Sequence, residues 1–253
     1  MSKEPLAARV ALVTGAGRNI GREIALSLAA SGTAVVVNVR STVEEGQSVV
    51  DEIAERDGRA LLCVADVADQ NAVLRMVAEV EAQWGRLDVL VNNAAVRRET
   101  KLDDISAADW HRTLAIILDG AFFCTQAALR LLRKSERPTI VNIGGMTGHT
   151  GAANRLHVVT AKAGLAGMTR ALAHELAPDG ITVNCVAPGM IDTVRHVASS
   201  SANPDHRRRH HTLLARHGTA EDVAQTVAWL AGDGARFVTG QVIHVNGGAY
   251  LGG

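Results

Sequence analysis

Residues 10–30 read VALVTGAGRNIGREIALSLAA, and this stretch decides the fold. The apolar run Val10–Val13 predicts a strand buried on both faces, and the apolar periodicity of Ile20–Ala30 predicts a helix. Between them, the glycines of Thr14–Gly21 permit a tight turn and a close approach of the main chain to a phosphate. The first N–H groups of the helix then face that anion. A glycine-rich turn between a strand and a helix therefore predicts a dinucleotide-binding site.

Short apolar runs alternate with longer amphipathic ones along the rest of the chain, without an internal repeat or a linker. The short runs predict parallel strands covered by helices, over Ala34–Val39, Leu61–Val64, Leu87–Val91, Thr139–Ile143, Ile181–Val186 and Gln241–Val245. The longer runs predict helices over Val43–Arg56, Asn71–Trp84, Ala107–Leu132, Leu156–Leu176 and Glu221–Ala231. We therefore expect an α/β fold, a Rossmann-type doubly wound parallel sheet of about seven strands flanked by helices. We expect it to form a single domain over residues 1–253.

The composition limits the class of protein. The 253 residues carry 26 basic and 26 acidic side chains, and the zero net charge argues against a nucleic-acid-binding protein. With 47% hydrophobic and 21% charged residues, the chain is globular rather than disordered. Its three cysteines stand in apolar runs, which favours reduced thiols in the cytoplasm. No apolar run has the ~18–20 residues of a membrane span, and Met1–Ala8 lacks a signal-peptide core, so we expect neither membrane association nor secretion.

The stretch Val194–Gly218 breaks the alternation, because it contains five arginines and five of the ten histidines. An insertion after a late strand lies beside the crevice at the carboxyl ends of the strands, so one interpretation is a basic lid over an anionic substrate. The other is a solvated helix with a charged face, and the sequence favours neither. His206 and His210 have helical spacing, but Asp205 is the only acid of the stretch and no thiol is near, so we predict no metal site.

The end of the second predicted strand bears on the choice of dinucleotide. NAD sites usually have an acid there, which binds the ribose 2′-hydroxyl, whereas Asn38–Thr42 contain none. Arg40 and Ser41 stand there instead, and Arg18 lies in the first turn. Two guanidinium groups can bind a 2′-phosphate through charge-assisted hydrogen bonds. Two ordinary surface arginines are the alternative, and we expect NADP(H) rather than NAD(H).

Further motifs follow the later predicted strands. They are Asp66-Val67, Asn92-Asn93-Ala94-Ala95, Pro188-Gly189-Met190-Ile191-Asp192-Thr193 and, near the C-terminus, Val238-Thr239-Gly240-Gln241 with Asn246-Gly247-Gly248. Together with Thr14–Gly21, their order and spacing resemble the short-chain dehydrogenase/reductase family, in the branch that contains 3-oxoacyl-carrier-protein reductases. The resemblance covers nearly the whole chain.

This resemblance implies contacts with the cofactor. The implied contacts are Asp66 and Val67 with the adenine, Asn93 and Ala94 with the ribose pocket, and Ile191 and Thr193 with the nicotinamide carboxamide. The complete predicted cofactor-binding set is Gly15, Gly17, Arg18, Asn19, Ile20, Gly21, Arg40, Ser41, Asp66, Val67, Asn93, Ala94, Lys162, Pro188, Gly189, Ile191 and Thr193.

The same resemblance identifies the positions that should carry the acid–base chemistry. The family uses an Asn, a Ser and a Tyr-x-x-x-Lys pair, in which the lysine lowers the pKa of the tyrosine one helical turn away. Lys162 stands at the lysine position, but the tyrosine, serine and asparagine positions hold Val158, Gly145 and Ile117. Tyr250 is the only tyrosine in the chain, so no shift of register restores the pair. Without these donors we do not expect ordinary ketone reduction.

Other polar side chains are candidates for the missing roles. A substitute proton donor could lie on the loop before Val158, which contains His149, Thr147 and Asn154. His149 is the strongest of these candidates, since histidine titrates near neutral pH. Arg97 and Arg98, after the Asn-Asn-Ala-Ala turn, could bind an anionic substrate. For each of these residues, an ordinary surface or loop position is the alternative.

Three functions remain open. The first is an NADP(H)-dependent oxidoreductase that acts on a carbonyl, alkene or imine of a small molecule by a mechanism without the Tyr–Lys pair, which the retained Lys162 favours. The second is a catalytically silent cofactor-binding subunit or sensor that partners an active paralogue, which the missing donors favour. The third, a redox-neutral cyclase or isomerase, has no residue of its own. The resemblance implies a homodimer or homotetramer, and the second function implies a hetero-oligomer.

Overall fold

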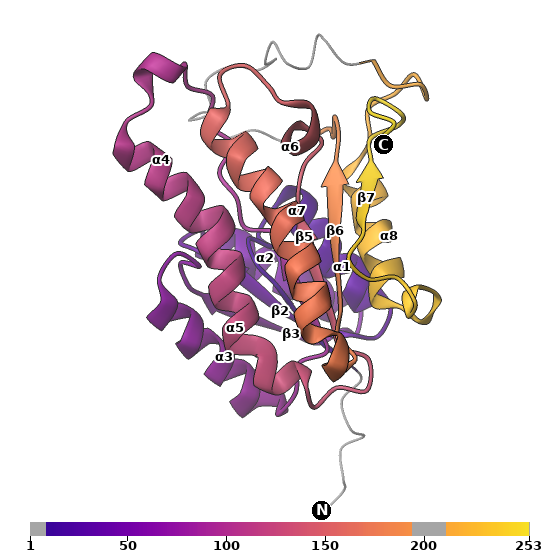
Figure 1. Ribbon diagram of the computed structural model, residues 1–253. Helices are drawn as coiled ribbons and strands as arrows, with labels where there is room; N and C mark the ends of the chain where they lie inside the picture. The colour runs from indigo at the N-terminus through magenta and orange to yellow at the C-terminus, as the bar shows by residue number, and fades with distance from the viewer. Residues whose placement is uncertain (1–8, 194–210, 253) are drawn as a thin grey trace, which may run out of the picture.

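A computed structural model describes residues 9–193 and 211–252, and Figure 1 shows the sheet that they form. Seven parallel strands are arranged in the order β3-β2-β1-β4-β5-β6-β7. They are β1 (Val10–Val13), β2 (Ala34–Val39), β3 (Ala60–Val64), β4 (Val89–Asn92), β5 (Thr139–Ile143), β6 (Thr182–Pro188) and β7 (Val242–Val245). The strand order reverses between β1 and β4, which confirms the predicted doubly wound sheet.

Helices cover both faces of this sheet (Figure 1). One face packs against α1 (Asn19–Ala30), α2 (Val43–Glu55) and α8 (Ala220–Ala231). The other packs against α3 (Gln70–Trp84), α5 (Gly120–Leu132) and α7 (Leu156–Leu176). The shorter helices are α4 (Ala107–Leu114) and α6 (Thr147–Thr150), with 3-10 turns at Leu102–Asp104, Ala177–Asp179 and Asp233–Ala235.

The pleat of the strands explains the two cores. In β1, Val10 and Leu12 point into the core on the α3, α5 and α7 side, whereas Ala11 and Val13 point into the other, and all four are fully buried. A strand covered on both faces has no polar side, so its sequence is a continuous apolar run. The strands are predicted from such apolar runs, and they agree with the observed strands to within two residues at each end.

The predicted helix Ala107–Leu132 is not one regular helix. It divides into α4, a π-helical turn over Ala115–Asp119, and α5. By length and composition alone, the combined stretch Ala107–Leu132 is long and apolar enough to cross a membrane. Within the described part of the chain, no other helix meets these two criteria. Its side chains Cys124, Ala128 and Leu131 belong to the core, so they pack against the sheet instead. A π-helical turn frequently marks a functional site, and this one carries Ile117.

Candidate functional site

The turn between β1 and α1 is packed too closely for side chains. Gly15 has a φ of +62°, in the left-handed region that favours glycine, and a Cβ there would lie 3.0 Å from the Cα of Ala94. A Cβ at Gly21 would overlap the Gly15 carbonyl oxygen and lie 2.5 Å from Nδ2 of Asn93. Glycine at these two positions therefore lets the main chain of the turn pack closely against Ala94 and Asn93 and brings the start of α1 to the end of β1. This is the arrangement that receives a pyrophosphate.

Two asparagines hold this turn in place. Asn93 donates from Nδ2 to the carbonyl oxygens of Thr14 (2.8 Å) and Gly15 (3.0 Å). Asn38, which is 1% exposed, accepts from the Gly15 N–H (3.3 Å) and donates to two carbonyl oxygens at the end of β3 (3.2 and 3.1 Å). The predicted ribose-pocket residue Asn93 thus also ties β4 to the first turn. The sequence gives no signal for the similar role of Asn38.

A cleft of about 430 Å³ opens along the carboxyl ends of β1, β2 and β4, and its volume suits a small-molecule site. The predicted residues that line it are Gly15, Gly17, Arg18, Asn19, Ile20, Gly21, Arg40, Ser41, Asp66, Val67, Asn93, Ala94 and Thr193. The predicted residues that do not line it are Lys162, Pro188, Gly189 and Ile191. Lining residues outside the predicted set include Asn38, Glu45, Arg97, Arg98 and Ile116.

Two cations stand at the β2 end of the cleft, where a 2′-phosphate would lie. Arg18 and Arg40 both line the cleft, and the side chain of Arg18 is 50% exposed. The Oε1 atom of Glu45, from α2, lies 3.7 Å from Nη1 of Arg18. Solvated ion pairs of this length are weak, so Glu45 does not prevent Arg18 from binding a phosphate. The glycine-lined turn and this pair of cations fit NADP(H).

Lys162 lies on α7 with 9% of its surface exposed, and its Nζ donates a hydrogen bond to the carbonyl oxygen of Ile143 at the end of β5. Burial lowers the pKa of this ammonium group, and the positive charges of Arg97 and Arg155 also lower it. Cys185 has the opposite effect and raises the pKa of Lys162. The resulting pKa of Lys162 is about 7. Unlike an exposed lysine, this amine changes its charge near neutral pH.

The positions at which the family resemblance implies Asn, Ser and Tyr are apolar. Ile117 and Val158 are each 2% exposed. Among the described residues, a Cβ at Gly145 would have a single neighbour within 4 Å, the Cγ of Lys162 at 3.9 Å. The side chains of Ile117 and Val158 can exclude water and shape a pocket, but they cannot donate a proton.

His149, the predicted substitute proton donor, belongs to an aromatic cluster beside β7. Its ring centroid lies 4.7 Å from that of His244 and 6.0 Å from that of Tyr250. Burial, aided by the charge of Arg170, lowers the pKa of His149 below its usual 6.5. The ring does not line the 430 Å³ cleft. The role of His149 as a proton donor therefore stays a prediction.

The two arginines predicted to meet an anionic substrate both line the cleft, but their surroundings differ. Nη1 of Arg98 lies 2.9 Å from Oδ1 of Asp109 on α4, so the negative charge of Asp109 partly neutralises the positive charge of Arg98. The positive charge of Arg97 contributes to the lowered pKa of Lys162.

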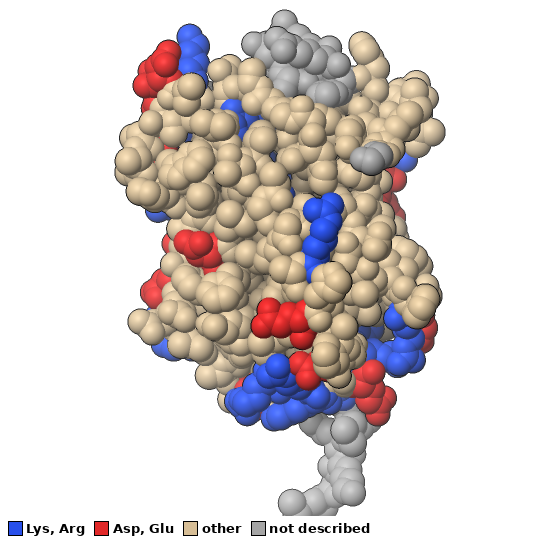
Figure 2. Space-filling view, viewed as in Figure 1, with Lys and Arg blue, Asp and Glu red and all other residues tan. Residues whose placement is uncertain are grey.

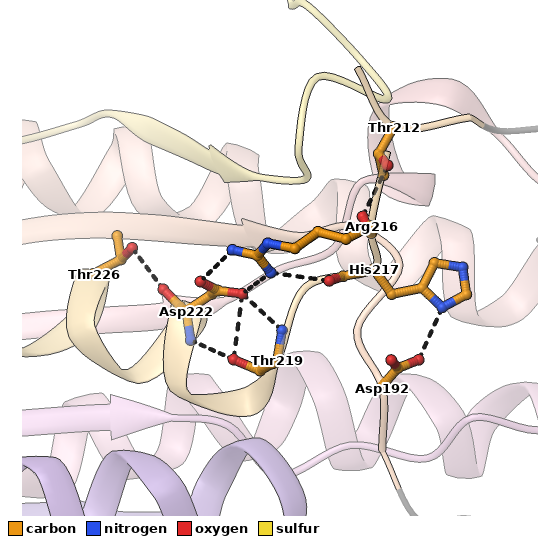
Figure 3. A network of polar contacts seen from close by, with 7 residues as sticks. All are labelled: Asp192, Thr212, Arg216, His217, Thr219, Asp222 and Thr226. Atoms are coloured by element: carbon orange, nitrogen blue, oxygen red, sulfur yellow. Dashed lines mark hydrogen bonds and ion pairs between the residues drawn. The ribbon is translucent and has the colours of Figure 1, made fainter. Parts of the chain in front are cut away.

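Most of the predicted basic lid, residues 194–210, lies outside the described residues. The part that follows is fixed by a polar network (Figure 3). Arg216 donates to the two carboxylate oxygens of Asp222 at 2.7 and 3.0 Å. Nδ1 of His217 lies 2.8 Å from Oδ1 of Asp192, which follows β6. These two basic side chains of the stretch therefore join it to α8 and to the end of β6.

The doubly wound sheet, its glycine-rich first turn and the cleft where the strand order reverses define an α/β protein of the Rossmann type. The family model described as enoyl-(acyl carrier protein) reductase matches residues 15–250. The chain belongs to the short-chain dehydrogenase/reductase family, in the branch of the 3-oxoacyl-acyl-carrier-protein reductases.

Relatives and solved structures agree with this assignment over nearly the whole chain. The 3-oxoacyl-[acyl-carrier-protein] reductase FabG of Staphylococcus aureus strain Mu50 is 42% identical over 241 residues, which cover 95% of this chain and 98% of the relative. The (2S)-[(R)-hydroxy(phenyl)methyl]succinyl-CoA dehydrogenase subunit BbsD of Thauera aromatica is 42% identical over 248 residues, covering 96% and 97%. The crystal structure of a short-chain dehydrogenase from Burkholderia cenocepacia J2315 in complex with NADP superimposes with a TM-score of 0.88 at 37% identity, covering 97% and 99%.

Proposed function

We propose that the protein is an NADP(H)-dependent oxidoreductase of a small molecule, whose proton chemistry does not use the Asn, Ser and Tyr of its family. The contrast between the two ends of the site carries this proposal. At the cofactor end, Arg18 and Arg40 flank a glycine-lined turn. At the other end, Val158 stands one turn before the buried Lys162. Because a buried amine is costly unless it has a role, Lys162 supports an enzyme over a purely structural protein.

The bound nicotinamide would supply or accept a hydride, and the residues of the chain would do the rest. Arg18 and Arg40 would bind the 2′-phosphate, and the N–H groups at the start of α1 would bind the pyrophosphate. Ile117 and Val158 would keep water from the reacting atoms. The proton would come from water, from the substrate or from Lys162, which suits a carbonyl, an activated alkene or an imine as the hydride acceptor.

Fluorescence titration of the purified protein with NADPH and with NADH tests the cofactor assignment. We expect micromolar NADPH binding and NADH binding that is weaker by about tenfold or more, because charge-assisted contacts to the phosphate are lost. Arg40→Gln should weaken NADPH binding by about tenfold and leave NADH unchanged. Arg75→Gln, at an exposed position on α3, is the matched control. Binding of neither nucleotide would overturn the proposal, and equal binding of both would overturn the preference for NADP(H).

A catalytically silent, cofactor-binding subunit of a mixed assembly is the second candidate. The Thauera aromatica relative is named as a dehydrogenase subunit. Figure 2 shows few charged side chains over the middle of the face that carries α5 and α7. Phe122 on α5 and Leu156 on α7 are 46% and 45% exposed, which fits a contact with another subunit.

Light scattering after size-exclusion chromatography separates these candidates, because it measures the mass of the assembly. A dimer or tetramer of this chain that oxidises NADPH supports the self-assembled enzyme. Assembly and activity that arise only after mixing with an active 3-oxoacyl reductase paralogue support the silent subunit.

A further inference from the structure

Two segments that are distant along the chain are joined beside the cleft. The first begins at Met190, after β6, and the second, residues 211–219, leads into α8. They pair as a short parallel bridge between Ile191 and Gly218. The Gly218 N–H donates to the carbonyl oxygen of Met190 at 2.9 Å, and the Asp192 N–H donates to that of Gly218 at 2.8 Å. These main-chain bonds fix the direction in which the first segment leaves the sheet.

A side-chain contact lies beside this bridge. Nδ1 of His217 lies 2.8 Å from Oδ1 of Asp192, and Figure 3 shows the ring turned toward Asp192. Arg216 donates to the carboxylate of Asp222 on α8 and to the main-chain carbonyl oxygen of His217. In the described part of the chain, Asp192 is therefore the carboxylate that the imidazole faces, and the contact is an ion pair when the ring is protonated.

This contact is next to a residue of the cleft. Asp192 is followed directly by Thr193, which lines the cleft. The segment that carries Thr193 leaves the sheet at β6, whereas Arg40 follows β2, and β1, β4 and β5 lie between these two strands. Thr193 thus approaches the cleft from the side opposite to the cations that fit the 2′-phosphate. A contact that holds Asp192 also limits the positions of Thr193, because one planar peptide unit joins them.

We propose, on the basis of the NADP(H)-dependent function above, that His217 is a positioning residue, whose contact with Asp192 holds Thr193 against the nicotinamide half of the cofactor. When a binding segment is in its competent position for only part of the time, the apparent affinity is reduced by that fraction. A protonated imidazole binds a carboxylate more strongly than a neutral one, so the contact strengthens as the pH falls. The side chains of His217 and Asp192 are 45% and 66% exposed, so solvent screens the pair, and its effect on affinity is about two- to fivefold.

Calorimetric titration with NADP⁺ and with adenosine 2′,5′-bisphosphate, which lacks the nicotinamide half, tests this role at about pH 5.5 and about pH 8.5. We expect His217→Ala to weaken NADP⁺ binding by about two- to fivefold at the lower pH and by less at the higher pH. Binding of the bisphosphate should not change, and since both ligands carry the 2′-phosphate, their ratio cancels the titration of that group. His217→Asn keeps an N–H donor without a charge, so its NADP⁺ affinity relative to the bisphosphate should not depend on pH. His174→Asn, at an exposed position of α7, is the matched control and should bind both ligands as the unchanged protein does.

Asp192→Asn shows whether His217 acts through this carboxylate. In the Asp192→Asn background, His217→Ala should cause no further loss of NADP⁺ affinity, because the effects of two residues in contact are not additive. A loss of the same size in both backgrounds would mean that His217 attracts the nucleotide directly, and it would overturn the proposal.

The outcomes also separate this inference from the cofactor assignment. If both ligands bind and His217→Ala weakens neither of them, or weakens both equally, the positioning role is wrong and the NADP(H) assignment stands. If neither ligand binds, the cofactor assignment is wrong, and the role of His217 is wrong with it.

Discussion

Val158 precedes Lys162 by one turn of α7, so the two side chains leave the same face of the helix. They are 2% and 9% exposed, respectively. Valine has no hydroxyl, and the Nζ atom of Lys162 donates to the carbonyl oxygen of Ile143 at the end of β5. The amine therefore has no neighbouring group on this helix face whose pKa it could lower.

The combined change Val158→Tyr, Gly145→Ser and Ile117→Asn should give NADPH-dependent reduction of a 3-oxoacyl thioester. The serine Cβ fits, because its nearest neighbour within the described part of the chain would be the Lys162 Cγ at 3.9 Å. A positioned general acid contributes about 10²–10⁴ in rate, so we expect an increase of at least about 100-fold in NADPH oxidation, followed by absorbance.

Val158→Phe, combined with the same two other changes, is the matched control for this gain. Phenylalanine fills the same volume without a hydroxyl, so its rate should stay at that of the unchanged protein. An equal rise in both variants would assign the gain to packing. If the tyrosine variant melts cooperatively and binds NADPH but gains no activity, the substrate pocket differs from that of the reductases as well.

Glu45→Gln should tighten the binding of NADPH. The carboxylate lies 3.7 Å from Arg18 and lines the same cleft, so it repels a phosphate bound there. Exposed charge pairs of this kind contribute about 0–1 kcal/mol, which corresponds to a gain in NADPH affinity of up to about fivefold. Added salt should reduce the gain. NADH has no 2′-phosphate and should bind as before, and equal tightening of both nucleotides would contradict the placement of the phosphate beside Arg18.

The sequence predicts the fold and most of the cofactor cleft because their signals are local. The run Val10–Val13 is apolar on both faces because both faces are buried, and Gly15 is a glycine where φ is +62°. Errors at strand ends have a tertiary cause. We predicted that the sixth strand ends at Val186, but it continues to Pro188 because Pro188 pairs with Val245 of β7.

The contacts of individual side chains are less predictable, because they join distant parts of the chain. Glu45 on α2 reaches Arg18, and Asn38 holds the first turn, although neither contact has a sequence signal. The π-helical turn at Ala115–Asp119 has an apolar pattern close to that of a regular helix. The partner of Lys162 is a main-chain carbonyl, which any residue type provides.

His157→Phe should stabilise the protein, most of all in mild acid. The side chain is 1% exposed, and neither ring nitrogen has a hydrogen-bond partner among the described residues. A buried polar group without a partner costs about 1–3 kcal/mol, part of which phenylalanine should recover. Burial lowers the pKa of His157 below its usual 6.5, opposed by Asp109 and reinforced by Arg155 and Arg98.

The sign of the pH effect follows from this lower pKa of the folded state. As the pH falls below about 6.5, the unfolded chain takes up the proton first, so the unchanged protein loses stability from this group. Urea denaturation at about pH 8 and about pH 5.5 measures the free energy of unfolding of both proteins. The advantage of the phenylalanine variant should be larger at the lower pH, and an equal advantage at both values would contradict a buried, neutral His157.

Asp222→Ala should destabilise the start of α8 more than Asp222→Asn does. Asp222 accepts from the Thr219 N–H (2.8 Å) and from Arg216 (2.7 and 3.0 Å), and its own N–H donates to the Thr219 hydroxyl at 3.2 Å (Figure 3). This reciprocal capping satisfies N–H groups that the helix leaves free, and its loss costs about 0.5–2 kcal/mol. Alanine removes the cap and the ion pair, whereas asparagine keeps one oxygen acceptor and loses the charge and one of the two oxygens to which Arg216 donates. Thermal melting at neutral pH measures both losses.

The pH dependence of the two proteins separates the charge of Asp222 from its role as an acceptor. Hydrogen bonds from Arg216, followed by those from Thr219, hold the pKa of Asp222 well below its usual range. The stabilisation by this carboxylate is therefore complete above the unfolded pKa of about 3.9, and it is lost progressively as the pH falls from there through the lower pKa of the folded state. The difference in Tm between the unchanged protein and Asp222→Asn should shrink between about pH 7 and about pH 3, because this aspartate takes up a proton in the unfolded chain in that range while it is still ionised in the folded protein. A difference that stays constant would assign the stabilisation to the acceptor geometry alone, without the ion pair with Arg216.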